Sequence, residues 1–200
     1  GVGMDEAWLR AADEFAAVSR RVWERGLVAG SGGNISLRVP DMGLVMIKPS
    51  GMAAVDCAPE DLIGLDLGGR VVVGRAKPSK DTNFHLGIYR ARPDVQGIVH
   101  AHAPWAIALG LLDYAELPLL TTQAAMKLRR VPVLPFAPSE SAELEALVVG
   151  AYRDPAVVAV LLARHGLVAT GPTLVAAEQI AELVEETAQI ALLVRMAGGR

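Results

Sequence analysis

The sequence of 200 residues predicts a layered α/β fold with a mixed or antiparallel sheet. Segments with strand and helix patterns alternate along the chain, and several strand candidates are joined by hairpin-like connections. The chain is 52% hydrophobic and 20% charged, which is enough apolar material for one large core. Together these observations favour such a sheet over a doubly wound parallel one.

The N-terminal half supplies one helix and then strands. Trp8, Phe15 and Val22 recur with helical spacing over residues 5–27, and the glycines at 26 and 30 end this helix. "GSGGNISLRV" predicts a glycine turn that leads into a strand, and "GLVMIKPSG" predicts a second strand. "LIGLDLGGRVVVG" predicts a hairpin that turns at Gly68 and Gly69.

The C-terminal half alternates helices with strands. We expect helices over residues 82–91, 142–152 and 173–196, the last capped by Thr173, and a short helix that starts at Pro104. "GIVHA" predicts a strand, and residues 157–163 predict a buried one. "RHGLVATG" then predicts a turn and a further strand.

Charge and composition exclude several classes of protein. The net charge is −3 and no basic stripe is present, which argues against a nucleic-acid surface. No apolar run reaches the roughly 20 residues that a membrane helix needs. The N-terminus lacks the pattern of a signal peptide, and a lone Cys57 is compatible with a reducing compartment. We therefore expect a cytoplasmic protein with no nucleic-acid or membrane partner.

Two histidines close the "GIVHAH" strand. His100 and His102 occupy alternate positions, so both imidazoles point to one face, where they could bind a metal or be ordinary polar residues. His165 follows the buried strand at 157–163, at a place that could bring it to the pair. Three imidazoles with an open position are typical of a catalytic divalent site. We expect His85, inside the 82–91 helix, to hydrogen-bond locally.

A carboxylate and three polar turns accompany these histidines. Asp81 lies where a loop enters a helix, so it is either a helix N-cap or the acid–base group of a metal site. The same loop carries Ser79 and Lys80, and "SGGN" and "PSG" are further turns rich in backbone and hydroxyl donors. Such turns form anion pockets. The pattern indicates a metal enzyme acting on a phosphorylated or carboxylated small molecule.

Four segments resemble the class II aldolase/adducin superfamily, roughly over residues 11–191. They are "GSGGNISLR", "IKPSG", "KPSKDTNFHLGIYRARPDVQGIVHAHAPWAIAL" and "RHGLVATGPTLVAAEQIAELVEETAQI". The resemblance implies one domain over residues 4–200, a three-layer α/β/α sandwich with a central mixed, largely antiparallel sheet. It also implies a homotetramer with sites near subunit interfaces. It implies a divalent metal, most often zinc, with manganese, cobalt or iron also tolerated, and the implied metal ligands are Asp81, His100, His102 and His165. The implied phosphate contacts are Ser31, Gly32, Asn34, Ser50, Gly51, Ser79 and Lys80.

The resemblance also implies the chemistry. It predicts a fuculose-phosphate-type aldolase, a lyase that cleaves a small ketose phosphate or hydroxy-keto compound through a metal-stabilised enediolate, with Asp81 moving the proton. Ala125 stands where the epimerase branch places an aspartate, which favours the aldolase. Asp81, where fuculose-type aldolases carry a glutamate, supports the alternative of an epimerase or decarboxylase. The adducin branch lacks the histidines, which disfavours a non-catalytic interaction module. Because Thr122 replaces the tyrosine of the aldolase branch, we expect another proton donor, such as solvent, Lys80 or a neighbouring subunit.

Overall fold

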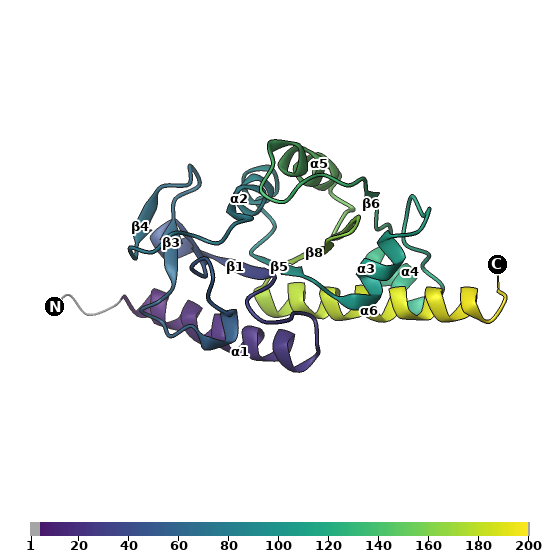
Figure 1. Ribbon diagram of the computed structural model, residues 1–200. Coiled ribbons are helices and arrows are strands. Elements are labelled where there is room, and N and C mark those ends of the chain that lie inside the picture. Colours follow the sequence, from purple (N-terminus) through teal and green to yellow (C-terminus); the bar gives the residue numbers. More distant parts are fainter. Residues whose placement is uncertain (1–4, 200) are drawn as a thin grey trace.

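The computed structural model describes residues 5–199, which form one sheet between two layers of helices (Figure 1). The sheet has the strand order β4-β3-β2-β1-β5-β8-β7-β6. Its strands are β1 (Asn34–Val39), β2 (Leu44–Ile47), β3 (Ile63–Leu65), β4 (Val71–Val73), β5 (Gly97–Ala101), β6 (Val133–Leu134), β7 (Ala159–Leu162) and β8 (Gly166–Gly171). Neighbouring strands are antiparallel except for β6 and β7, which are parallel. The predicted mixed, largely antiparallel sheet is confirmed.

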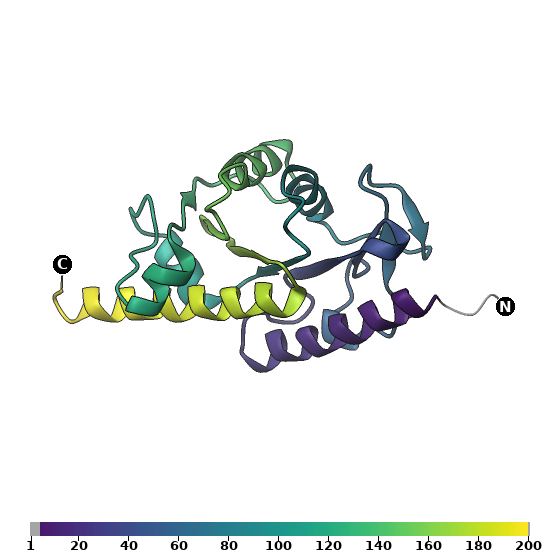
Figure 2. The same cartoon turned by 180° about the vertical axis from the view of Figure 1, so that it is seen from behind.

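The helices divide between the two faces of the sheet. One face is covered by α2 and α5, and the opposite face by α1 and α6 together with α3 and α4 (Figures 1 and 2). The helices are α1 (Glu6–Glu24), α2 (Thr82–Ala91), α3 (Pro104–Gly110), α4 (Thr122–Leu128), α5 (Ala142–Tyr152) and α6 (Leu174–Met196), with short 3₁₀ turns at Pro40–Met42 and Ala54–Asp56. This arrangement is the three-layer α/β/α sandwich implied by the resemblance.

Alternation along the central strands separates two cores. In β5, Val99 and Ala101 pack toward α1 and α6, whereas Ile98 belongs to the cluster beneath α2 and α5. His100 therefore points to the α2 side, because side chains two residues apart share a face. A register slip of one residue would move His100 into the other core, so burial of β5 fixes the direction of the imidazole.

Two glutamates within helices each accept hydrogen bonds from the N-terminal end of another helix. Glu14 of α1 accepts hydrogen bonds from the backbone N–H groups of Leu174 and Val175, at the start of α6. Glu185 of α6 accepts from the N–H groups of Trp105 and Ala106, at the start of α3, over 3.3 and 2.8 Å. Each carboxylate satisfies N–H groups that have no partner within their own helix. Because α3 directly follows His102, Glu185 helps to fix the chain beside the site.

Most predicted elements are confirmed. Thr173 caps α6 through Ala176 N, and the β3–β4 hairpin turns at Gly68 and Gly69. The first helix ends at Glu24 rather than near residue 27, with Gly26 in the left-handed region at φ +67°. Helix α4 and the short strand β6, in a proline-rich passage, were not predicted, because each has little periodicity of its own and depends on tertiary packing.

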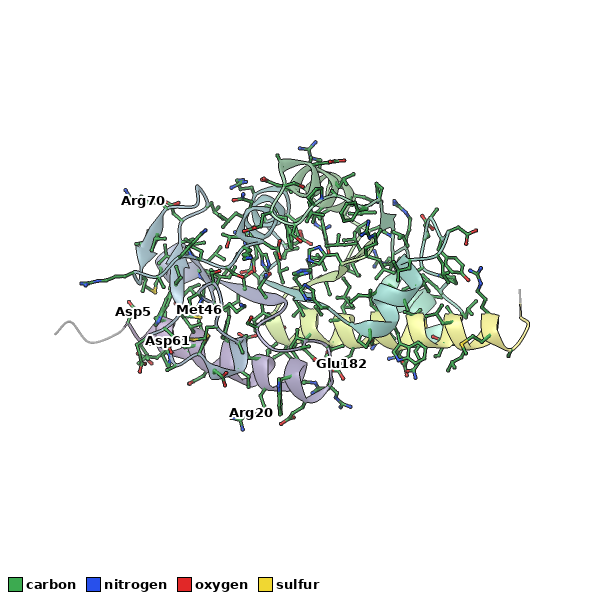
Figure 3. The ribbon with its side chains drawn as sticks, in the orientation of Figure 1. Asp5, Arg20, Met46, Asp61, Arg70 and Glu182 are labelled. Atoms are coloured by element: carbon green, nitrogen blue, oxygen red, sulfur yellow. The ribbon has the colours of Figure 1, made fainter. Side chains whose placement is uncertain are left out.

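Helices α1 and α6 meet through charged side chains. Arg21 of α1 pairs with Glu182 of α6 over 2.8 Å, and Figure 3 labels Glu182 at this junction. Figure 3 also labels Asp5, whose carboxylate accepts from Ala7 N and so caps α1. Among residues 5–199, no helix is both long and apolar enough to cross a membrane.

Candidate functional site

Three imidazoles converge where the central strands end. Nε2 of His100 lies 3.2 Å from Nε2 of His102 and 3.1 Å from Nε2 of His165. His100 comes from β5, His102 follows that strand, and His165 precedes β8, the antiparallel neighbour of β5. The structure therefore brings together the three histidines that the sequence predicts as metal ligands, and their nitrogens form a group that could hold an ion.

The protonation of the imidazoles suits a cation. Nδ1 of His100 lies 2.9 Å from the carbonyl oxygen of Leu167 and donates to it, so Nε2 is the ring nitrogen that faces the other two histidines. Burial lowers the pKa of His102 and of His165 to about 4, which keeps both rings neutral near pH 7. Bonds of about 2.0–2.1 Å to a tetrahedral ion would place two ligand nitrogens about 3.3 Å apart. The residues present fit a divalent metal.

Asp81 lies beside this cluster, and its side chain does not cap a helix. It stands at the N-cap position of α2, but its carboxylate makes no capping hydrogen bond within the described chain. Oδ2 lies 3.4 Å from His100 Nε2 and accepts from Asn34 Nδ2 over 3.3 Å. Oδ1 is buried and has no partner among residues 5–199. An unpaired buried carboxylate oxygen is costly, and a bound cation would offset that cost.

Burial and the neighbouring imidazoles act on Asp81 in opposite directions. Burial by itself would raise the pKa of the carboxyl group. The hydrogen bonds from His100 and Asn34, together with the nearby imidazole of His165, lower that pKa well below its usual range. Asp81 is therefore an ionised acceptor at neutral pH, as a metal ligand or a base must be.

Glycines allow the strand ends to approach this closely. A Cβ on Gly166 would lie 2.1 Å from the carbonyl oxygen of Ala101, so a larger residue would push His165 away from β5. Gly33 has φ +70°, and a Cβ there would lie 2.7 Å from the carbonyl oxygen of His100. Gly32, a predicted phosphate contact, lies directly against the His102 ring. The "SGGN" turn therefore also packs against His100 and His102.

The three polar turns lie side by side. Ser50 N donates to the Lys77 carbonyl over 2.9 Å, and Ser79 N donates to the Lys48 carbonyl over 3.1 Å. The Lys48 ammonium donates to the carbonyls of Ser31 and Met52 over 3.3 and 2.8 Å, which ties the "SGGN" turn to the "PSG" turn. Of the predicted phosphate contacts, Asn34 and Ser79 are buried, Gly32 and Ser50 are half-buried, and Ser31, Gly51 and Lys80 are exposed.

Sequence reasoning missed two buried residues of this region. Lys48 is only 2% exposed, and burial lowers its pKa. A lysine at the end of the apolar strand "LVMIK", directly before the "PSG" turn, was the available signal. The prediction that His85 hydrogen-bonds locally was wrong. His85 is fully buried and bonds to β1, at Asn34 Oδ1 (2.5 Å) and Ser36 Oγ (2.6 Å).

Comparison with known proteins agrees with this arrangement. Residues 13–192 match the family described as the Class II Aldolase and Adducin N-terminal domain. This chain belongs to that family. It is 36% identical over 178 residues to the 5-deoxy-D-ribulose 1-phosphate aldolase of Bacillus thuringiensis serovar kurstaki, covering 89% of this chain and 82% of that protein. It is also 36% identical over 186 residues to the 3-oxo-tetronate 4-phosphate decarboxylase of Pectobacterium atrosepticum, covering 90% and 83%.

A solved structure extends the likeness to three dimensions. An L-fuculose 1-phosphate aldolase superposes with a TM-score of 0.89 at 31% identity, covering 99% of this chain and 91% of that one. The sheet and helix layers of the family member described here are therefore those of an aldolase of known structure.

Proposed function

We propose that this family member is a divalent-metal-dependent aldolase that cleaves a small ketose 1-phosphate between C3 and C4. The observation that carries the proposal is the convergence of three imidazole nitrogens beside Asp81, whose Oδ1 has no partner within residues 5–199. The relatives named for aldol cleavage of 5-deoxy-D-ribulose 1-phosphate and L-fuculose 1-phosphate support the substrate class.

The metal would be held by His100, His102 and His165, with Asp81 at the remaining position or beside it. When bound, a divalent cation supplies Lewis-acid polarisation of the substrate carbonyl. Zinc suits three imidazoles and a carboxylate, although manganese, cobalt and iron accept the same ligands. The choice of zinc is part of the proposal.

The turns beside the histidines would bind the phosphate. The Lys48 ammonium is held between the carbonyls of Ser31 and Met52, beside these turns, and its charge complements an anion. Phosphate contacts distant from the reacting bond orient C3 and C4 at the metal and supply binding energy. The set proposed for this role is Ser31, Gly32, Asn34, Ser50, Gly51, Ser79 and Lys80.

Asp81 would move the proton. As an ionised carboxylate it accepts the proton of the C4 hydroxyl while the C3–C4 bond breaks and an aldehyde leaves. The same group returns that proton to C3, which releases dihydroxyacetone phosphate, so the proton count balances over the cycle. The proposed role needs no tyrosine donor.

Two further properties belong to the proposal. A homotetramer is supported by exposed apolar side chains. Leu193 and Met196 near the end of α6 are 47% and 78% exposed, and Leu111, directly after α3, is 62% exposed. A cytoplasmic location is supported by the free thiol of Cys57. Light scattering of the purified protein tests the first, and fractionation of the source cells tests the second.

The decisive assay offers metal-loaded protein a panel of ketose 1-phosphates that includes 5-deoxy-D-ribulose 1-phosphate and L-fuculose 1-phosphate. We expect dihydroxyacetone phosphate to appear in a coupled reductase assay, and chelator or His100→Ala to abolish it. A panel without turnover in protein that contains stoichiometric metal would refute the proposal.

Decarboxylation of a 3-keto acid phosphate is the second candidate. It is supported by the identity of 36% to the 3-oxo-tetronate 4-phosphate decarboxylase. The two reactions differ in the carbon lost: decarboxylation releases carbon dioxide, and aldol cleavage releases an aldehyde. Offering 3-oxo-tetronate 4-phosphate and a ketose 1-phosphate in parallel decides between them: carbon dioxide released from the first indicates the decarboxylase, and aldehyde released from the second indicates the aldolase.

A further inference from the structure

Polar side chains of β1 and α2 interleave beneath the helix, next to the metal cluster. Alternate residues of β1 face α2, and residues four apart on α2 face the strand. A strand advances about 6.6–6.8 Å in two residues and a helix about 6 Å in four, so the two series stay in step. We call this set the polar ladder; its members are Asn34, Ser36 and Arg38 of β1 and Asp81, His85 and Tyr89 of α2.

Each rung is a hydrogen bond between the two elements. From Asp81 Oδ2, the ladder passes to Asn34 Nδ2 (3.3 Å) and from Asn34 Oδ1 to His85 Nε2 (2.5 Å). It continues from His85 Nδ1 to Ser36 Oγ (2.6 Å) and from Ser36 Oγ to the Tyr89 hydroxyl (2.9 Å). Each of these five side chains is at most 7% exposed.

The orientation of the Asn34 amide dictates the direction of the following bonds. Asn34 donates from Nδ2 to the Asp81 carboxylate, which leaves its carbonyl oxygen facing His85. His85 therefore carries a proton on Nε2, and Nδ1 accepts from the Ser36 hydroxyl.

The far end of the ladder is closed. Tyr89 is 1% exposed, and the Arg38 guanidinium lies 4.8 Å from the centre of its ring. Arg38 donates in turn to the carbonyls of Tyr89 and Val95. Because the Tyr89 hydroxyl is buried and a guanidinium does not give up its protons, this end of the ladder cannot pass protons to the solvent. Its consistent direction serves to hold groups in place.

We propose that His85, supported by Ser36 and Tyr89, is a positioning residue that locks the Asn34 amide and thereby holds Asp81 Oδ2 at the metal cluster. The inference rests on the metal site of the proposed function. It gives Asn34 a task besides the predicted phosphate contact, since both polar atoms of its amide are already bonded to Asp81 and His85. Apart from the bond of His85 to Asn34, the side chains of His85, Ser36 and Tyr89 form no hydrogen bond with the proposed metal ligands or with the phosphate turns, so they act through Asn34.

Two substitutions of His85 distinguish its hydrogen bond to Asn34 from its hydrogen bond to Ser36. A glutamine places its amide nitrogen near the position of Nε2, so His85→Gln keeps the bond to Asn34 and loses the bond from Ser36. An asparagine is shorter and places its polar atoms near Nδ1, so His85→Asn keeps the contact with Ser36 and loses Asn34. We expect His85→Asn to raise the dissociation constant of Co²⁺ about 10-fold or more and to change the cobalt absorption spectrum. His85→Gln should stay close to wild type in both.

A merely structural role for His85 gives a different result. In that case both variants would lower the melting temperature and leave cobalt affinity unchanged, or would lower affinity equally, and the proposal would be wrong. Tyr89→Phe and Tyr152→Phe form a matched control pair. Each removes one buried hydroxyl, but Tyr152 lies on α5 and donates to the carbonyls of Val158 and Val168. Only Tyr89→Phe should weaken cobalt binding.

A measurement on the wild-type protein covers the case in which the variants do not fold. ¹⁵N spectra of the imidazoles should show His85 protonated at Nε2 and His100 protonated at Nδ1. A His85 ring protonated at Nδ1 would overturn the inference. Wild-type protein that binds metal but cleaves no ketose phosphate would refute only the proposed function, whereas protein that binds no metal would refute both.

Discussion

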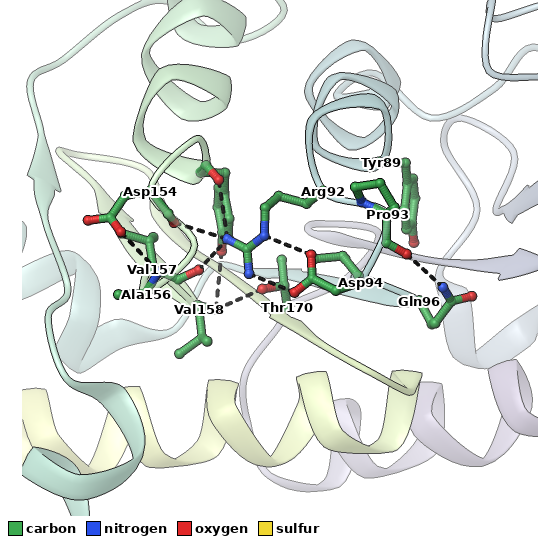
Figure 4. A network of polar contacts seen from close by, with 12 residues as sticks. Tyr89, Arg92, Pro93, Asp94, Gln96, Asp154, Ala156, Val157, Val158 and Thr170 are labelled. Atoms are coloured by element: carbon green, nitrogen blue, oxygen red, sulfur yellow. Dashed lines mark hydrogen bonds and ion pairs between the residues drawn. The ribbon is translucent and has the colours of Figure 1, made fainter.

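Helix α2 carries a buried charge at each end, Asp81 before its first residue and Arg92 after its last. The two residues are 7% and 6% exposed. Arg92 is fully paired: it donates to both carboxylate oxygens of Asp94 and to the carbonyls of Tyr152, Asp154 and Val157 (Figure 4). Asp81 keeps one oxygen without a partner within the described residues.

The difference separates structure from function. Arg92 joins the ends of α2 and α5 to the start of β7, and its hydrogen bond with Asp94 raises its pKa further. Nothing more is needed to stabilise this guanidinium. Asp81 is ionised, lies beside three imidazoles and has one oxygen without a partner within residues 5–199, which is the arrangement expected of a group that binds a ligand. A buried charge that folding leaves unsatisfied is a better indicator of a site than burial or charge alone.

Substitution of Asp81, at the start of α2, should have the largest effect on catalytic activity. We expect Asp81→Asn to lower kcat/KM by about 10²–10⁴-fold, because an amide cannot accept the substrate proton. The melting temperature should also fall, because a depressed pKa means that the fold stabilises the ionised carboxylate at neutral pH. Asp94→Asn is the control at the other end and should retain activity. Equal kcat/KM for the two variants would remove the distinction between the ends of α2.

Substitution at the Arg92 end should affect stability instead. Arg92→Met leaves three carbonyls and the Asp94 carboxylate without their donor, and we expect a loss of about 2–4 kcal/mol in the free energy of unfolding. Urea denaturation measures this loss, and activity per folded molecule should be unchanged. Arg90→Met on the same helix removes an arginine whose side chain is 48% exposed and should cost less than about 1 kcal/mol. A smaller loss for Arg92→Met than for Arg90→Met would contradict this account.

The cluster of three histidines could be predicted because local rules decide their positions. Side chains alternate between the two faces of a strand, so His100 and His102 share one face. The turn after the buried strand brings His165 to the end of the strand that neighbours theirs. The polar ladder depends on a contact of another kind. It needs β1 beside β5, which sets Asn34 opposite His100, and it needs α2 above β1. Those placements follow from packing of the whole sheet and are not encoded in either segment alone.

Part of the ladder was nevertheless visible in the sequence. The alternation in "NISLR" and the four-residue spacing of Asp81, His85 and Tyr89 are the periodicities of a strand and a helix with polar residues on their buried faces. Two such polar faces in one domain predict a contact between them, because each needs partners. The choice between an N-cap and a site for Asp81 could not be made from sequence, since both uses place an aspartate at the same junction.

Glu178 is a second buried carboxylate that can be compared with Asp81, and the effect expected from its substitution is the smallest of those predicted here. This residue of α6 is fully buried, and neither carboxylate oxygen accepts a hydrogen bond from residues 5–199. Arg21 Nε lies 3.0 Å away but donates to Glu182, so only its charge reaches Glu178. Unlike Asp81, Glu178 is outside the histidine cluster, and burial together with Glu182 raises its pKa from 4.5 to about 8.

The raised pKa sets the sign of the pH dependence. Between about pH 4.5 and 8 the folded protein binds a proton at Glu178 that the unfolded chain releases, so this group stabilises the fold at low pH and loses that contribution as the pH rises. Glu178→Gln removes the titration. We expect its melting temperature to match the wild type near pH 5 and to exceed it by roughly 3 °C or more near pH 8.5, with activity unchanged. A gap that is the same at both pH values would show that Glu178 stays ionised. Lost activity would show that an unpaired carboxylate marks a functional site even without imidazoles around it.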